Sequence, residues 1–197
     1  MTEQNRFEEI ATHLAELKDT SELMIDLAYS ALMLNSKELA EEVQRLEEHV
    51  DNLHTEFELL ALTSDFKKEE ACGFLGLIRL GVATEKIADA AAEMAEIVLR
   101  GIEPHQILKI TISEAEETVT QVCVAEKSLL VNKTLKEVRV HEKSGMWIQV
   151  IKRGGKCIRP RPDSRIQAGD ILIASGYAEG VEKLKKMASP DETCNIE

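Results

Sequence analysis

The sequence predicts an α+β protein in which an antiparallel three-helix bundle over residues 1–101 precedes a small mixed α/β domain over residues 117–187. Two observations predict this division. The apolar residues recur at helical steps of three and four before Gly101, and they follow a strand-like alternation after it. The charge changes at the same place, because residues 1–101 hold 9 basic and 22 acidic side chains whereas residues 102–197 hold 15 and 14.

Three long helices account for the first region. Apolar residues keep helical spacing from Phe7 to Ala31, and a second set keeps it from Leu39 to Leu60. Asn35 and Ser36 form a turn between these sets, and Ser36 is a favourable N-cap for the second helix. The third helix is expected over residues 67–100, ending at Gly101. Long helices joined by short turns pack as an antiparallel bundle.

Short strands and turns account for the second region. Residues rich in β-branched side chains predict strands over 118–124, 147–151 and 171–174, and the Gly154-Gly155 pair predicts a hairpin turn. A helix is expected over 178–187. The remaining segments are expected to be a linker helix over 102–116 and a flexible tail over 188–197.

Composition excludes several classes of protein. No window approaches the roughly 18 uninterrupted apolar residues of a membrane helix. The amino-terminal segment MTEQNRFEEI is too polar for a signal peptide. We therefore expect no direct membrane insertion and a cytoplasmic location. The net charge of −12 argues against a nucleic-acid partner. Without CxxC spacing, the four cysteines are expected to be reduced thiols.

Two carboxylate pairs in the helical region have metal-ligand spacing. Glu47 and Asp51, and likewise Glu85 and Asp89, lie four residues apart and therefore project from one helix face. Each pair can bracket a divalent cation with oxygen ligands. In a region this acidic, the same pairs are also expected on a face that is merely solvated.

A basic cluster surrounds the predicted hairpin in the second region, formed by Lys152, Arg153, Lys156, Arg159, Arg161 and Arg165. Arginine makes two-point contacts with phosphate, so this cluster can receive a small anionic ligand such as a nucleotide. Alternatively, the hairpin is solvated or pairs with the acidic helices. The chain has no GxGxxG, P-loop or nucleophile-elbow motif, so we do not expect an enzyme.

The second region resembles the TrkA C-terminal domain, the regulatory module of prokaryotic potassium channels and transporters. The resemblance covers about residues 115–187 and rests on Lys133-Thr134-Leu135, Gly145, Val150-Ile151, Arg153-Gly154, Pro160 and Gly169-Asp170-Ile171. It implies a homodimer with a ligand pocket between the subunits, where some members bind a cyclic dinucleotide. The ligand-binding residues that it implies are Ile148, Ile151, Arg153, Arg159 and Pro160.

The helical region resembles a single three-helix unit of PhoU proteins. Those proteins carry carboxylate pairs that hold iron or zinc clusters, which implies Glu47, Asp51, Glu85 and Asp89 as metal ligands here. PhoU proteins have two such units and this chain has one, so a full set of sites requires a dimer.

Together the two resemblances imply a cytoplasmic regulatory subunit of potassium transport that acts beside a membrane channel or transporter. The alternative is a PhoU-like metal-binding adaptor in phosphate-uptake signalling. No cofactor is certain, and NAD is not expected because the nucleotide-binding domain that precedes TrkA C-terminal domains in channel regulators is missing.

Overall fold

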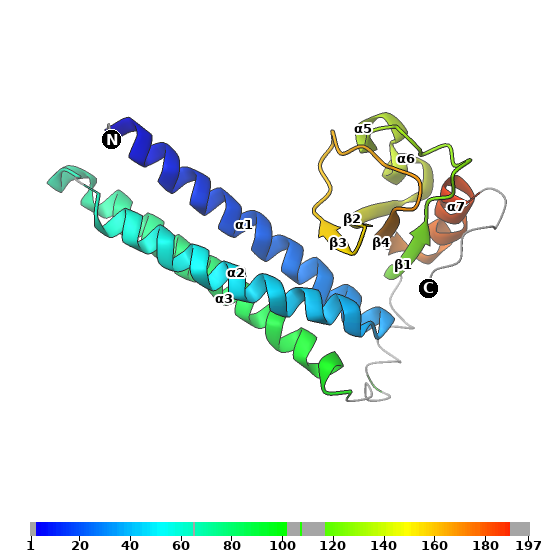
Figure 1. The fold of residues 1–197 in the computed structure, drawn as a ribbon, viewed down its shortest axis with the longest axis horizontal. Coiled ribbons are helices and arrows are strands. Elements are labelled where there is room, and N and C mark those ends of the chain that lie inside the picture. The colour runs from blue at the N-terminus through cyan, green and yellow to red at the C-terminus, as the bar shows by residue number, and fades with distance from the viewer. Residues whose placement is uncertain (1–2, 65, 102–106, 108–116, 190–197) are drawn as a thin grey trace. The chain divides into compact units, whose positions relative to one another are not determined.

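The computed structural model of the protein describes residues 3–64, 66–101, 107 and 117–189. These residues form two compact units, the first of which ends at Gly101. Three long helices make the first unit, and a small sheet with helices makes the second (Figure 1). The predicted α+β fold class is confirmed. Nearly all of the predicted linker helix over 102–116 lies outside the described residues.

The long helices of the first unit are α1 (Glu3–Leu34), α2 (Lys37–Leu62) and α3 (Ala71–Leu99), with a short 3-10 helix, η1 (Lys68–Glu70), before α3. Ser36 is the N-cap of α2, and its hydroxyl accepts a hydrogen bond from the backbone N–H of Leu39 at 3.4 Å. This cap satisfies one of the free N–H groups of the first helical turn, as the sequence predicts.

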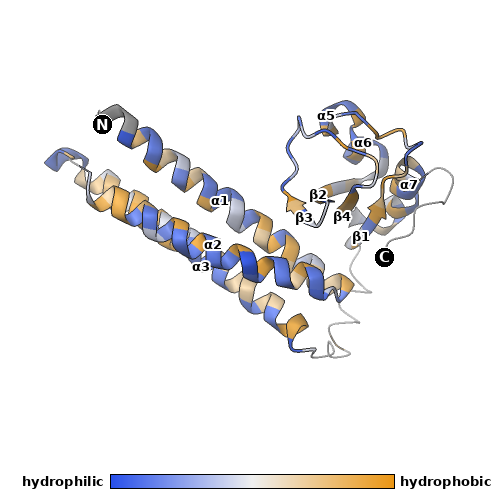
Figure 2. Ribbon diagram, viewed as in Figure 1, coloured by the Kyte–Doolittle hydropathy of each residue, from blue (hydrophilic) through white to orange (hydrophobic). Residues whose placement is uncertain are grey.

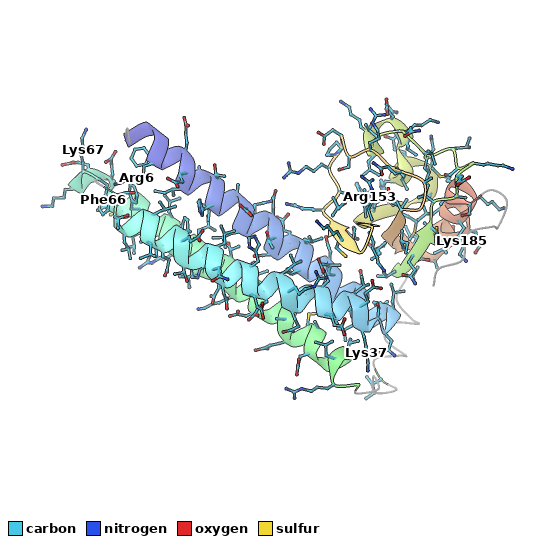
Figure 3. All side chains as sticks on the ribbon, viewed as in Figure 1. Arg6, Lys37, Phe66, Lys67, Arg153 and Lys185 are labelled. Carbon is cyan, nitrogen blue, oxygen red and sulfur yellow. The ribbon has the colours of Figure 1, made fainter. Side chains whose placement is uncertain are left out.

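Side-chain contacts show that α1 and α2 run in opposite directions. Near one end, the Arg6 guanidinium donates to the Thr63 carbonyl oxygen at 2.8 Å. Further along, Glu16 Oε1 lies 3.1 Å from His49 Nε2. The residue number rises on α1 while it falls on α2, which is the antiparallel arrangement. Figure 3 shows Arg6 at the same end of the unit as Phe66, shortly after α2.

Helices α2 and α3 are also antiparallel, and they pack closely. Gln44 Nε2 donates to the Ala92 carbonyl oxygen at 3.0 Å. At Gly81 an added Cβ would lie 2.5 Å from Cε1 of the fully buried Phe57, so only glycine allows this approach. Hydrophobic and hydrophilic residues both recur along these helices (Figure 2). No helix among the described residues is long and apolar enough to cross a membrane.

The second unit contains a four-stranded antiparallel sheet in the order β1-β4-β2-β3. Its strands are β1 (Glu117–Cys123), β2 (Met146–Arg153), β3 (Lys156–Ile158) and β4 (Ile171–Tyr177). The turn between β2 and β3 has positive φ at Gly154 (56°) and Gly155 (78°), which matches the predicted hairpin turn.

In the part of the second unit that the structure describes, three helices accompany the sheet, namely α5 (Leu135–Val138), α6 (Val140–Ser144) and α7 (Ala178–Ala188). Helix α6 was not predicted. The first two residues of the predicted tail belong to the folded unit, because Ala188 is fully buried and the Ser189 hydroxyl donates to the Cys123 carbonyl oxygen at 2.8 Å. The rest of the predicted tail, residues 190–197, lies outside the described residues.

The expectation of four reduced cysteines is wrong, because Cys123 is disulfide-bonded. Cys72 is a free thiol. Spacing along the sequence does not reveal such a bond, because the two thiols of a disulfide meet through the fold.

Candidate functional site

A cleft of about 520 Å³ lies in the second unit. It is formed by α5, α6, the start of β2 and the segment that follows β3. Most of its wall is apolar, and Lys136, Arg139 and Arg161 add positive charge. The lining residues are Leu135, Lys136, Arg139, Val140, His141, Glu142, Met146, Trp147, Ile148, Pro160, Arg161 and Pro162.

Hydrogen bonds and backbone conformation within residues 134–139 position the two short helices that line this cleft. The Thr134 hydroxyl accepts from the backbone N–H of Glu137 at 3.2 Å, and the Glu137 carboxylate accepts from the backbone N–H of Thr134 at 2.7 Å. This reciprocal capping box starts α5, and the hydrogen bonds with Thr134 lower the pKa of Glu137. Arg139 then adopts a left-handed φ of 53°, which separates α5 from α6.

Two aromatic rings stack at the cleft. The rings of His141 and Trp147 have centroids 3.8 Å apart and planes inclined by 20°. Trp147 is nevertheless 58% exposed, so much of its surface is open to a further planar group. An exposed aromatic ring beside basic side chains is suited to a ligand that combines an aromatic ring with a negative charge.

The structure brings only part of the predicted ligand set to this cleft. Ile148 and Pro160 line it, whereas Arg159 does not. Ile151 is 1% exposed and belongs to the hydrophobic core of the unit, so it cannot reach a ligand in the cleft. Sequence reasoning missed the His141–Trp147 pair, although an isolated tryptophan in a chain with 4% aromatic residues is a usable signal.

Arg153 is held by Asp170 and lies outside the lining of the cleft. Its Nε and Nη2 donate to the two carboxylate oxygens of Asp170 at 2.7 and 2.8 Å. Nη2 also donates to the Arg165 carbonyl oxygen at 2.8 Å. The hydrogen bond with Asp170 raises the pKa of the Arg153 guanidinium. These bonds give Arg153 a structural role, and its predicted ligand contact stays a prediction.

In the first unit, three carboxylates gather between α2 and α3. One oxygen each from Glu47, Asp51 and Asp89 lies within 4.8 Å of the others. Partial burial raises the pKa of Glu47, and the negative charges of Asp51 and Asp89 raise it further. A divalent cation would relieve this repulsion, and an all-oxygen donor set suits a hard cation. The structure does not bring Glu85, the fourth predicted ligand, into this group.

Family models match both units. The PhoU domain model matches residues 14–98, and the TrkA-C domain model matches residues 119–189. Potassium channel protein 1 of Methanocaldococcus jannaschii is 37% identical to this chain over 95 residues, which are 48% of this chain and 28% of the relative. The chain therefore spans little more than a quarter of that relative's length.

Two solved structures with similarity to the chain contain isolated RCK_C domains. The RCK_C domain dimer of BusR from S. agalactiae, in complex with c-di-AMP, is 27% identical and has a TM-score of 0.35, covering 36% of this chain and 96% of that chain. The RCK C domain of the potassium transport protein KtrA, in complex with cyclic diadenosine monophosphate, is 24% identical and has a TM-score of 0.34. That match covers 41% of this chain and 94% of that chain.

The two model matches follow one another along the chain in the order that the sequence predicts. Residues 14–98 are a PhoU domain and residues 119–189 are a TrkA-C domain.

Proposed function

We propose that this protein is a cytoplasmic regulatory subunit of potassium transport, without enzymatic activity, whose TrkA-C domain binds a small aromatic anion as part of a homodimer. The observation that carries the proposal is the cleft beside the His141–Trp147 stack, with Lys136 and Arg161 in its wall. The similarity to a potassium channel protein supports the link to potassium transport. A nucleotide or cyclic dinucleotide has the required chemistry.

Ligand binding can regulate a partner only if the ligand prefers one conformation of the protein over another. In the proposed function, occupancy of the cleft changes the TrkA-C dimer, and the dimer passes this change to a membrane channel or transporter subunit. The chain acts at the membrane periphery, through that partner. Reciprocity requires that the partner also change the affinity for the ligand.

The test is calorimetric titration of the full chain with a panel of nucleotides and cyclic dinucleotides. We expect at least one to bind with an affinity that Arg161→Gln reduces about tenfold, which corresponds to roughly 1.4 kcal/mol. Lys156→Gln is the matched control, because Lys156 is an exposed cation on the β2–β3 hairpin outside the cleft. Absence of binding by every panel member, or equal losses in both variants, would refute the ligand role.

A second candidate function rests on the carboxylates of the PhoU domain. We propose that Glu47, Asp51 and Asp89 hold a divalent cation such as iron or zinc, and that the PhoU domain acts as a metal-binding adaptor in phosphate-uptake signalling. The support is that the three side chains offer oxygens within 4.8 Å of one another. An ion between them would neutralise the charges that Asp51 and Asp89 place beside Glu47.

Metal analysis of the purified full chain tests this second candidate. Asp89→Asn removes a charge from the group of three, whereas Glu85→Gln removes the same charge from the same helix outside the group. We expect the bound iron or zinc to fall severalfold in Asp89→Asn and to be unchanged in Glu85→Gln. If the protein holds no metal after reconstitution, or if both variants hold equal metal, these three carboxylates do not form a metal site, and the proposed metal-binding adaptor function is excluded.

A further inference from the structure

Two histidine–glutamate pairs join α1 to α2, and each helix supplies one of the histidines. His49 Nε2 of α2 lies 3.1 Å from Oε1 of Glu16, which is a hydrogen-bond distance, and both side chains are 50% exposed. His13 Nε2 of α1 lies 3.5 Å from Oε2 of Glu56, and the His13 side chain is only 20% exposed. The first pair is an ordinary surface hydrogen bond, and the second is longer and more buried.

The backbone of α1 fixes the tautomer of the neutral His13 ring. Its Nδ1 lies 2.9 Å from the carbonyl oxygen of Glu9, and a carbonyl oxygen can only accept a hydrogen bond. Nδ1 therefore carries the proton, and Nε2 of the neutral ring presents a lone pair. Histidines that bind a metal ion almost always donate the N–H of their other ring nitrogen to a carboxylate, a backbone carbonyl or water, as His13 does here.

The lone pair of His13 Nε2 faces a carboxylate oxygen of Glu56, which is also an acceptor. Two acceptors repel each other unless a proton or a cation lies between them. A tetrahedral zinc ion, with bonds of about 2.0–2.2 Å to nitrogen and oxygen, separates two such ligand atoms by about 3.3–3.5 Å. The distance of 3.5 Å between Nε2 and Oε2 therefore fits two ligands of one ion.

Glu9 places a further carboxylate on the same face of α1. It lies one helical turn before His13, so the two side chains project from one side of the helix. Its Oε2 is shielded from solvent and has no hydrogen-bond partner among the described residues. A buried carboxylate oxygen without a partner is costly, and a nearby cation would offset that cost.

We propose that His13 and Glu56, with Glu9 as a further oxygen donor, bind a divalent transition-metal cation such as zinc between α1 and α2. Zinc accepts a donor set of one imidazole nitrogen and carboxylate oxygens, whereas magnesium prefers oxygen donors alone. The bound ion joins α1 to α2 and so stabilises the packing of α1. None of these residues belongs to the three carboxylates between α2 and α3, so this site goes beyond both candidate functions.

The experiment separates this site from the three carboxylates between α2 and α3. Glu56 is 66% exposed, so the ion at His13 should exchange with solvent and be lost on repeated desalting. The metal that the desalted protein retains then belongs to the three carboxylates. Zinc titration uses the full chain with Asp89→Asn, which breaks that group of three. Failure of either site is thereby measured independently of the other.

We expect calorimetric titration of this protein with zinc chloride to show binding that His13→Gln weakens by about tenfold or more. Glu56→Gln should weaken it as well, and this exposed position makes unfolding of the variant an unlikely cause. His49→Gln is the matched control, because His49 also pairs with a glutamate between the same two helices. It should leave the affinity for zinc unchanged. Magnesium chloride should not compete with zinc.

Nitrogen-15 NMR of the histidine rings gives a readout that a mere loss of packing would not produce. Zinc should shift the resonance of His13 Nε2 and leave both ring nitrogens of His49 in place. Absence of zinc binding, equal weakening in His13→Gln and His49→Gln, or competition by magnesium at equal concentration would each overturn the proposal. A zinc-dependent shift at His49 in place of His13 would overturn it too, since the ion would then lie at the exposed pair.

Discussion

The guanidinium of Arg153 and the carboxylate of Asp170 form a two-point ion pair, with N···O distances of 2.7 and 2.8 Å. Asp170 is 1% exposed, and its Oδ2 also accepts the backbone N–H of Gln167 at 2.8 Å. One buried side chain thereby fixes the end of β2, the turn before β4 and the segment near Arg165. The Gly169-Asp170 motif of the TrkA-C domain thus has a structural explanation in this protein.

Asp170→Ala should destabilise the TrkA-C domain by about 1–3 kcal/mol, because it leaves the backbone N–H of Gln167 and the Arg153 guanidinium without their common acceptor. The measurement is urea unfolding followed by the fluorescence of Trp147, which is the only tryptophan of the chain. Glu142→Ala is the control, since Glu142 forms an exposed ion pair with Arg139, and it should change stability by less than about 0.5 kcal/mol. Equal stability of the two variants would contradict the structural role of Asp170.

Features set by neighbouring residues were predictable from the sequence. The Ser36 cap and the Gly154-Gly155 turn depend on a few adjacent positions, and both are found. The role of Arg153 was not predictable, because its partner Asp170 lies 17 residues away, in the turn before β4. Helix α6 was missed because it is a single short turn that begins after a left-handed arginine, Arg139.

The carboxylate pairs also show that contacts between distant residues cannot be predicted from local spacing. Spacing along a helix establishes that Glu85 and Asp89 share a face of α3, but it does not say which of them faces α2. The approach of α3 to α2 brings Asp89 to Glu47 and Asp51, and Glu85 stays outside the group. The register between two helices depends on packing contacts such as that of Gly81 with Phe57, which a single sequence does not reveal.

Gly180→Ala should destabilise the TrkA-C domain, although alanine normally favours a helix by about 0.5–1 kcal/mol. The added Cβ would lie 2.3 Å from the Ser144 carbonyl oxygen and 2.9 Å from Met146 Cγ. Overpacking of this kind costs typically about 1–3 kcal/mol. Urea unfolding followed by Trp147 fluorescence measures the effect, and Glu179→Ala at the neighbouring exposed position is the control. A stabilising effect of Gly180→Ala would show that α7 does not approach α6 this closely.

Glu47→Gln should stabilise the metal-free PhoU domain at neutral pH. The folded-state pKa of Glu47 is raised above 4.5, so the folded protein binds protons more tightly there than the unfolded chain. The free energy of unfolding therefore falls as the pH rises from 4.5 through the raised pKa. Glutamine carries no charge, so Glu47→Gln should not lose stability in this way. The expected gain in the free energy of unfolding at neutral pH is less than about 1 kcal/mol, because solvent screens the site.

Urea unfolding followed by far-ultraviolet circular dichroism, with a chelator present, measures this pH dependence. The difference between Glu47→Gln and the unmodified protein should vanish below pH 4.5, where the carboxyl is protonated in both states. Glu41→Gln, at an exposed position of α2, is the control for a general change in net charge. A stability gain that is the same at every pH would disprove the electrostatic origin.

Trp147 should report directly on occupancy of the cleft. Its ring stacks on His141 at the cleft wall, and a ligand ring placed against its open face would alter its emission. We expect nucleotides that bind to quench the fluorescence of the full chain in a saturable way, whereas inorganic pyrophosphate, which has charge but no ring, leaves it unchanged. Quenching should shift to about tenfold higher concentration in Lys136→Gln, because this removes one of the cations in the wall. Calorimetric binding of a nucleotide with no change in emission would place the ligand elsewhere in the protein.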